Sequence, residues 1–208
     1  DERVGEAWGN KVLRIKVNPD ATYSIPAGNL FAPGTARTRP EIYAMGFRNP
    51  FRMSVDKATG TVYVGDYGPD AGTANASRGP AGQVEFNRIT KAGNFGWPYC
   101  TGENDAYVDH DFAGGTAGAA FNCGAPRNTS PRNTGLTELP PAQPAWIPYD
   151  GGSVPEFGNG SESPMGGPVY RYDAGSTSEV KFPAEYDGDF FAGEYGRRHI
   201  GHLMAAER

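Results

Sequence analysis

The sequence lacks the features that mark several large classes of protein. It has no run of about 18 apolar residues, so no segment is long enough for a transmembrane helix. Acidic residues exceed basic ones, with 24 Asp and Glu against 19 Lys and Arg. The net charge of −5, without a basic stripe, argues against nucleic acid as a partner. The two cysteines do not have the spacing of metal ligands.

Glycine, proline and aromatic residues are abundant instead. The chain contains 30 Gly and 18 Pro, and 12% of its residues are aromatic. So much Gly and Pro can indicate disorder, but the aromatic residues supply more anchoring surface than a disordered chain usually has. The composition therefore favours a loop-rich, all-β protein.

Cys100 and Cys123 flank a loop rich in Gly, Ala and Asp. We expect a disulfide that closes this loop, although two free thiols are the alternative. Closing a loop of about two dozen residues would stabilise the fold by about 3 kcal/mol. Because disulfides persist in oxidising compartments, this pair predicts a secreted or periplasmic location.

Periodic patterns predict a small antiparallel meander within residues 41–93. Residues 42–45 are a short apolar strand, and residues 51–55 alternate apolar and polar side chains with period two. A tight turn with Asp and Gly precedes a returning strand at 61–64, and residues 83–89 alternate again. The loops of this meander, rather than its strands, carry the unusual residues.

Four short motifs follow one another in these loops and strands. They are Arg48-Asn49-Pro50, Gly68-Pro69, Glu85-Phe86-Asn87 and the run from Asn94 to Pro98. In this order they resemble the soluble quinoprotein sugar dehydrogenases, the glucose/sorbosone dehydrogenase family. The resemblance implies a six-bladed β-propeller that binds pyrroloquinoline quinone (PQQ) and calcium and oxidises an aldose at its anomeric carbon.

The length of 208 residues is too short for such a ring. At about 40 to 50 residues per blade, with long loops, we expect only about two blades of a partial propeller. Residues 41–93 would form the best-defined blade, residues 94–164 a long loop insertion, and residues 165–208 the start of a further blade. The chain would then be a fragment, a processed piece or a truncated product of a larger enzyme.

The resemblance assigns several residues to the cofactor. Arg48 would be a catalytic residue that contacts PQQ and stabilises negative charge on its oxygens, with Asn49 beside it. The alternative for Arg48 is a surface ion pair with Glu41 or Asp66. Trp97 would stack on a planar ring or pack between blades. Arg197 or Arg198 would bind the carboxylates of the cofactor, unless this pair belongs to a solvated turn.

Calcium would be bound mainly through backbone oxygens. The resemblance assigns the carbonyls of Gly68 and Pro69 to this role, and Ca²⁺ readily accepts such ligands. Asp66 and Glu85 are acids that would ligate or neutralise the ion. An ordinary β-turn is the alternative for Gly68-Pro69, and the insertion from residue 71 to 82 is longer than the family pattern.

The reaction also requires a general base, which the sequence does not supply in a recognisable place. The three histidines, His110, His199 and His202, lie in no matching context, and we assign none of them as the base. We therefore expect part of a sugar dehydrogenase, acting on a small-molecule sugar with an external electron acceptor and with the rest of the propeller or fused domains as partners. The alternatives are a non-catalytic propeller module that binds carbohydrate or protein, and a truncated product without a function of its own.

Overall fold

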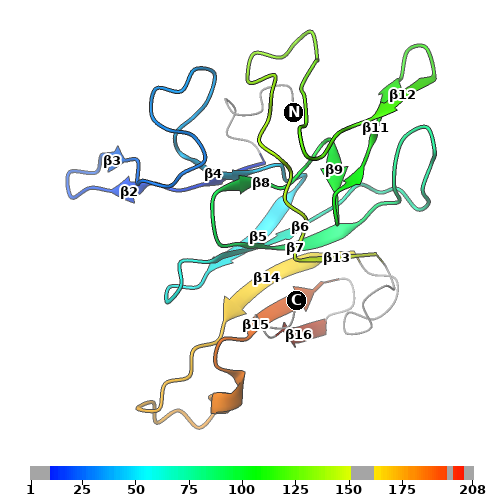
Figure 1. The fold of residues 1–208 in the computed structure, drawn as a ribbon. Helices are drawn as coiled ribbons and strands as arrows, with labels where there is room; N and C mark the ends of the chain where they lie inside the picture. The colour runs from blue at the N-terminus through cyan, green and yellow to red at the C-terminus, as the bar shows by residue number, and fades with distance from the viewer. Residues whose placement is uncertain (1–9, 151–161, 196–198, 204–208) are drawn as a thin grey trace.

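A computed structural model describes residues 10–150, 162–195 and 199–203. Almost all its regular structure is β (Figure 1). The strands are β1 (Val12–Leu13), β2 (Lys16–Val17), β3 (Tyr23–Ser24), β4 (Ile42–Met45), β5 (Pro50–Val55), β6 (Val62–Asp66), β7 (Val84–Ile89), β8 (Gly93–Asn94), β9 (Cys100–Thr101), β10 (Asp105–Ala106), β11 (Val108–Asp111), β12 (Thr116–Ala120), β13 (Ile147–Tyr149), β14 (Pro164–Val169), β15 (Phe190–Glu194) and β16 (His199–Leu203). A short 3₁₀ helix, η2, spans Ala184–Tyr186. Among these described residues, no helix is long and apolar enough to cross a membrane.

The central element is an antiparallel sheet with the strand order β13-β7-β6-β5. A three-stranded sheet, β14-β15-β16, lies against one of its faces, with β14 next to β5 and β6. A third sheet, β1-β4-β8, lies toward the other face, as Figure 1 shows. The three sheets therefore form successive layers.

Alternation along β6 and β7 provides apolar residues to both faces of the central sheet. Tyr63 and Phe86 belong to a buried cluster with Phe190 of the last sheet, and the Tyr63 and Phe190 rings stack 4.5 Å apart. Val64 and Ile89 belong to a second cluster, toward the β1-β4-β8 sheet. Because successive side chains of a strand point to opposite faces, each strand contributes to two interfaces.

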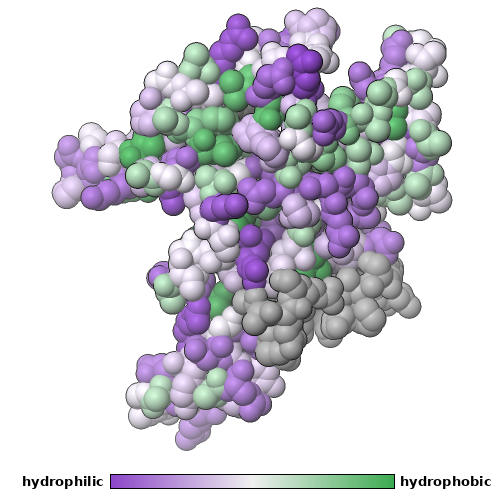
Figure 2. Space-filling model, viewed as in Figure 1, coloured by the Kyte–Doolittle hydropathy of each residue, from purple (hydrophilic) through white to green (hydrophobic). Residues whose placement is uncertain are grey.

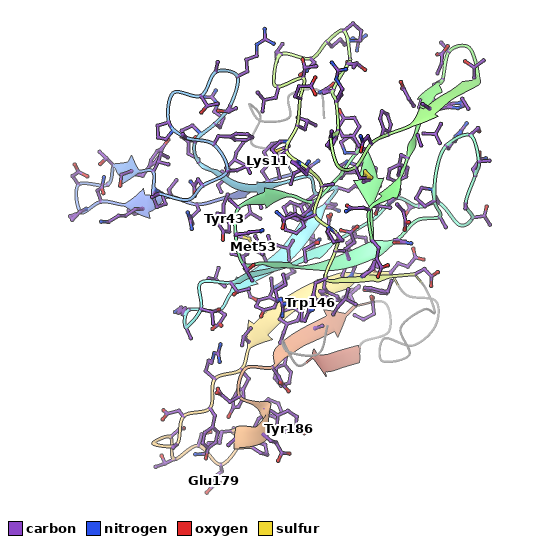
Figure 3. All side chains as sticks on the ribbon, viewed as in Figure 1. Lys11, Tyr43, Met53, Trp146, Glu179 and Tyr186 are labelled. Atoms are coloured by element: carbon purple, nitrogen blue, oxygen red, sulfur yellow. A yellow bond between two sulfur atoms is a disulfide. The ribbon has the colours of Figure 1, made fainter. Side chains whose placement is uncertain are left out.

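Trp146 completes the interface between the central and last sheets (Figure 3). Its ring lies 5.6 Å from Tyr63 and 5.8 Å from Phe190. The segment that carries it, just before β13, lies in the region expected to be a loop. Part of the predicted loop insertion therefore belongs to the packed layers of sheets.

The structure differs from the expected blade in two places. β4 does not pair with β5 but with β1 and β8, because the chain turns out of the strand at Gly46, which has φ +83°. The fourth strand of the central sheet is β13, whose one partner among the described strands is β7, so β13 lies at the edge of this sheet. An edge position tolerates Pro148, which cannot donate a ladder hydrogen bond.

Candidate functional site

All four sequence motifs contribute to one small cavity at the end of the central sheet. The cavity has a volume of about 10 Å³, which is room for about one water molecule or ion. Its lining residues come from strands β6, β7 and β9 and from the loops after β4, β6 and β8. They are Gly46, Arg48, Asp66, Gly68, Gln83, Glu85, Phe95, Trp97, Cys100 and Thr101.

Gly46 allows two of these motifs to meet. A Cβ atom at this position would lie 2.2 Å from Asn94 Oδ1 and 2.6 Å from the backbone nitrogen of Gly96. The Trp97 N–H donates to the Gly46 carbonyl at 3.0 Å. Since only glycine has no Cβ and readily adopts a positive φ, this residue is what brings the Arg48 loop and the Trp97 loop together.

Asp66 and Glu85 lie directly opposite each other on β6 and β7. Both side chains are buried, with 5% and 6% of their surface exposed. Burial, and the charge of the nearby Glu85, raise the pKa of Asp66 to about 7. Burial also raises the pKa of Glu85. Two buried carboxylates placed side by side favour a bound proton or a bound cation between them.

Each carboxylate also holds one wall of the cavity. Asp66 accepts hydrogen bonds from the backbone N–H groups of Arg48 and Asn49, at 3.0 and 2.7 Å. Glu85 accepts from the Gly102 N–H at 2.5 Å and from the Thr101 hydroxyl at 3.0 Å. The two acids therefore fix the loop before β5 and the turn after β9.

Arg48 is half-buried, and its guanidinium lies between two groups of the site. Its Nη1 donates to the Tyr67 carbonyl at 3.4 Å, and its Cζ lies 5.9 Å from the centre of the Trp97 ring. Trp97 in turn makes an edge contact with Tyr107 at 5.6 Å. The Trp97 ring therefore packs against Tyr107 and also lies beside the Arg48 guanidinium.

Asn49 lines a different space from Arg48. It lies at the edge of an open pocket of about 510 Å³, together with Tyr67, Met165 and Tyr195 among others. A pocket of this size can hold a drug-sized planar ligand, whereas the small cavity cannot. Tyr67 connects the two spaces, because its carbonyl contacts Arg48 while the residue lines the open pocket.

Of the four predicted calcium ligands, Asp66, Gly68 and Glu85 line the small cavity. Gly68 lies against the neighbouring strand so closely that a Cβ atom would overlap the Gln83 carbonyl. Pro69 is not part of the lining, and its carbonyl accepts the Ala71 N–H at 2.8 Å. The structure therefore brings three of these residues together, while Pro69 lies toward the insertion.

Gln83 is a site residue that the sequence motifs did not reveal. Its Oε1 atom is buried and has no hydrogen-bond partner among the described residues, and Gln83 lines the cavity. Among the described residues, no three His, Cys, Asp or Glu side chains could together hold a metal ion. A cation here would need amide and backbone oxygens beside the two carboxylates, and such a donor set suits a hard ion such as Ca²⁺.

The other predicted residues lie around or outside this centre. The structure contains the predicted Cys100–Cys123 disulfide, and Cys100 forms part of the cavity wall. His110 lies on the β11–β12 hairpin, where its Nδ1 is 3.0 Å from the Ser77 carbonyl. Arg197 and Arg198 lie outside the described residues, so their predicted contact with the cofactor stays a prediction.

The layered β-sheets and the four motifs that line one cavity agree with a comparison of this chain with known protein families. The family model for Glucose / Sorbosone dehydrogenase matches residues 5–122, and the chain belongs to this family. Over 151 residues it is 26% identical to quinoprotein glucose dehydrogenase B of Acinetobacter calcoaceticus, covering 67% of this chain and 28% of the relative. Over 116 residues it is 31% identical to the HIPL1 protein of Arabidopsis thaliana, covering 55% of this chain and 13% of the relative.

A solved structure of a glucose dehydrogenase has the same fold. It superposes with a TM-score of 0.51 at 18% identity, over 99% of this chain and 43% of that chain. The prediction of an all-β fold that forms part of a quinoprotein-type β-propeller is therefore confirmed. The chain spans less than half the length of each of these relatives.

Proposed function

We propose that this chain is part of a quinoprotein sugar dehydrogenase, which oxidises an aldose at its anomeric carbon with PQQ and calcium. One observation carries the proposal. Four motifs that are separated along the sequence line a single cavity of about 10 Å³ at the end of the central sheet. Packing alone does not require an arginine and two buried acids to line one small cavity.

The cavity suits a single hard cation. Asp66, Glu85 and the Oε1 atom of Gln83 would provide side-chain oxygens, and the backbone of Gly68 lies beside them. A divalent ion would neutralise the two buried acids, whose ionised forms are costly without a partner. All these donors are oxygens, as calcium prefers.

The open pocket beside the cavity suits a planar cofactor. Bound PQQ would supply a quinone that accepts the two electrons of the sugar as a hydride. Arg48 would stabilise the negative charge that then develops, because a guanidinium presents a positive charge and a planar set of N–H donors. Asn49, which follows Arg48, and Tyr67 line this pocket and would orient the ring system of the cofactor.

The proton of the sugar hydroxyl needs a base that lies elsewhere. His110 is on a separate hairpin and contacts Ser77, and no described side chain at the cavity is a histidine. We therefore propose that the base, and the binding sites of the sugar and of an external electron acceptor, include residues of further blades. The disulfide supports a secreted or periplasmic location.

The lack of a histidine among the described side chains at the cavity favours a second candidate function. A propeller module without a base would bind carbohydrate or protein without oxidising it. Thermal unfolding in chelator, in calcium, in calcium with PQQ and in calcium with glucose distinguishes the two. The dehydrogenase proposal expects the largest rise of the melting temperature with calcium and PQQ together. A rise with glucose alone, and none with PQQ, would favour the binding module.

A further inference from the structure

The last residue of β6, Asp66, is tied to the Arg48 loop by its side chain. Its two carboxylate oxygens accept the backbone N–H groups of Arg48 and Asn49, at 3.0 and 2.7 Å. The next residue adds a bond in the same direction, because the Tyr67 N–H donates to the Asn49 carbonyl at 3.2 Å. With only 5% of its surface exposed, Asp66 is shielded from water that would compete for these bonds.

Regular pairing in the sheet does not hold the N–H groups of this loop. Arg48 and Asn49 precede β5, and the register of β5 against β6 is irregular between Pro50 and Arg52. Pro50, directly after them, has no N–H to donate to the ladder. The Asp66 carboxylate therefore supplies the two acceptors that a regular neighbouring strand would otherwise provide.

We propose that Asp66 is a positioning residue that fixes the Arg48 guanidinium beside Trp97 and the Tyr67 carbonyl. This inference rests on the proposed function, in which Arg48 faces the cofactor. It also gives Asp66 a role that does not depend on a cation, since both oxygens already accept a backbone N–H. A positioning role explains why an acid occupies this buried place: a carboxylate accepts at both oxygens, whereas the amide of Asn would turn an NH₂ group toward one of the two N–H donors.

The test compares the wild type with Asp66→Asn by amide hydrogen exchange and by the NMR signal of the Trp97 indole N–H. Asp56→Asn is the matched control, because Asp56 is also 5% exposed but contacts Arg171 at a distant turn. Arg48→Ala provides the Trp97 signal expected when the guanidinium is absent. We expect exchange of the Arg48 and Asn49 amides to become about tenfold faster or more in Asp66→Asn, beyond any change in Asp56→Asn.

The Trp97 signal of Asp66→Asn should move toward that of Arg48→Ala. With calcium present, the dissociation constant for PQQ should rise about tenfold or more in Asp66→Asn, beyond any change in Asp56→Asn. Should Asp66→Asn fail to fold, the wild type decides, because the Arg48 and Asn49 amides must be protected from exchange although no backbone carbonyl of the described residues accepts them. Unprotected amides in the wild type, or an unchanged Trp97 signal in folded Asp66→Asn, would overturn the inference. If the wild type binds no PQQ but Asp66→Asn still changes both the amide exchange and the Trp97 signal, the proposed function is refuted. The positioning of Arg48 by Asp66 then still stands.

Discussion

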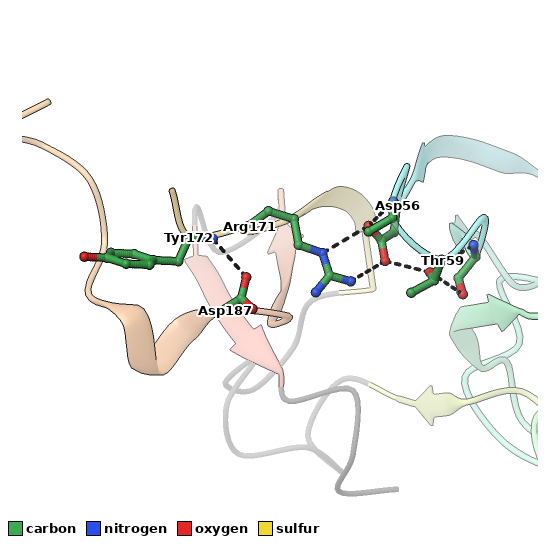
Figure 4. Close-up of polar contacts among 7 residues, drawn as sticks. Asp56, Thr59, Arg171, Tyr172 and Asp187 are labelled. Atoms are coloured by element: carbon green, nitrogen blue, oxygen red, sulfur yellow. Dashed lines mark hydrogen bonds and ion pairs between the residues drawn. The ribbon is translucent and has the colours of Figure 1, made fainter. Parts of the chain in front are cut away.

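At the scale of single residues, one charged pair connects sheets that are far apart in the sequence. Arg171, just after β14, donates to both oxygens of Asp56 in the β5–β6 turn, at 3.2 and 2.5 Å (Figure 4). The Thr59 hydroxyl donates to the same carboxylate at 2.6 Å. The hydrogen bond from Arg171, assisted by that from Thr59, lowers the pKa of Asp56 to about 2.

This pair predicts how stability depends on pH. An acid whose pKa is lowered by folding stabilises the folded state above its unfolded pKa, and this contribution is lost as the pH falls from about 4 to about 2. Asp56→Asn should lower the free energy of unfolding by about 1 to 3 kcal/mol at pH 7. Urea titrations from pH 7 to pH 2 should show the difference from the wild type shrinking toward zero. A difference that stays constant down to pH 2 would contradict the role of this ion pair.

Gln83 gives a second prediction at this scale. Within the described part of the chain its buried Oε1 has no hydrogen-bond partner, so the apoprotein bears the cost of an unsatisfied oxygen. Gln83→Leu should therefore leave the apoprotein at least as stable, while it weakens calcium binding about tenfold by removing one ligand. Calorimetric calcium titrations and thermal unfolding of the apoprotein check both parts. Unchanged calcium affinity would remove Gln83 from the proposed ligand set.

At the scale of elements, Gly46 decides whether two loops can meet. Gly46→Ala would introduce both backbone strain and contacts of 2.2 to 2.7 Å with the Asn94–Gly96 loop. Gly60 is the matched control, because it also has a positive φ, +74°, but no atom of the described residues lies within 4 Å of its hypothetical Cβ. We expect Gly60→Ala to cost about 1 to 2 kcal/mol and Gly46→Ala distinctly more. Urea denaturation measures both costs, and equal values would refute the close approach as the reason for Gly46.

The sequence predicted those elements whose pattern is local. Alternation correctly indicated β5, β6 and β7. β13 was not predicted, because three residues that include a proline carry no period. The motifs indicated Arg48, Gly68 and Glu85, but Gln83 was missed because its importance arises only when β7 lies beside the Gly68 turn. Nor could sequence spacing show that Asp66 bonds the Arg48 loop, since that depends on the register of β5 and β6.

At the scale of the whole molecule, the layers of sheets end in apolar surfaces. Phe51, Met53 and Val55 of β5 are more than half exposed, at 58%, 57% and 52%. Beside the last sheet, an open groove of about 930 Å³ is lined by Met165 and Phe191 from its strands and by Phe182 from the connection between β14 and β15. Figure 2 shows apolar residues at the surface, and Figure 3 marks Met53 near β5. Because the chain covers 43% of the glucose dehydrogenase that it resembles in fold, we propose that further sheets of the ring cover these surfaces.

This proposal predicts that the isolated chain binds an apolar dye through β5. Met53→Lys should reduce the fluorescence of bound dye without lowering the free energy of unfolding, since the side chain is exposed. Ala58→Lys is the control, because it adds the same charge to an exposed position of the adjoining turn. A loss of stability in Met53→Lys would show that the isolated chain already buries this residue.

The measurement that tests the central claim most directly is a calorimetric titration of PQQ into the folded chain, with calcium and with a chelator. We predict saturable binding of one PQQ that requires calcium and becomes about tenfold or more weaker in Arg48→Ala. This result would mean that the cavity and the open pocket form a cofactor site. The absence of binding in both conditions, from protein shown to be folded, would contradict the claim that this chain carries that site.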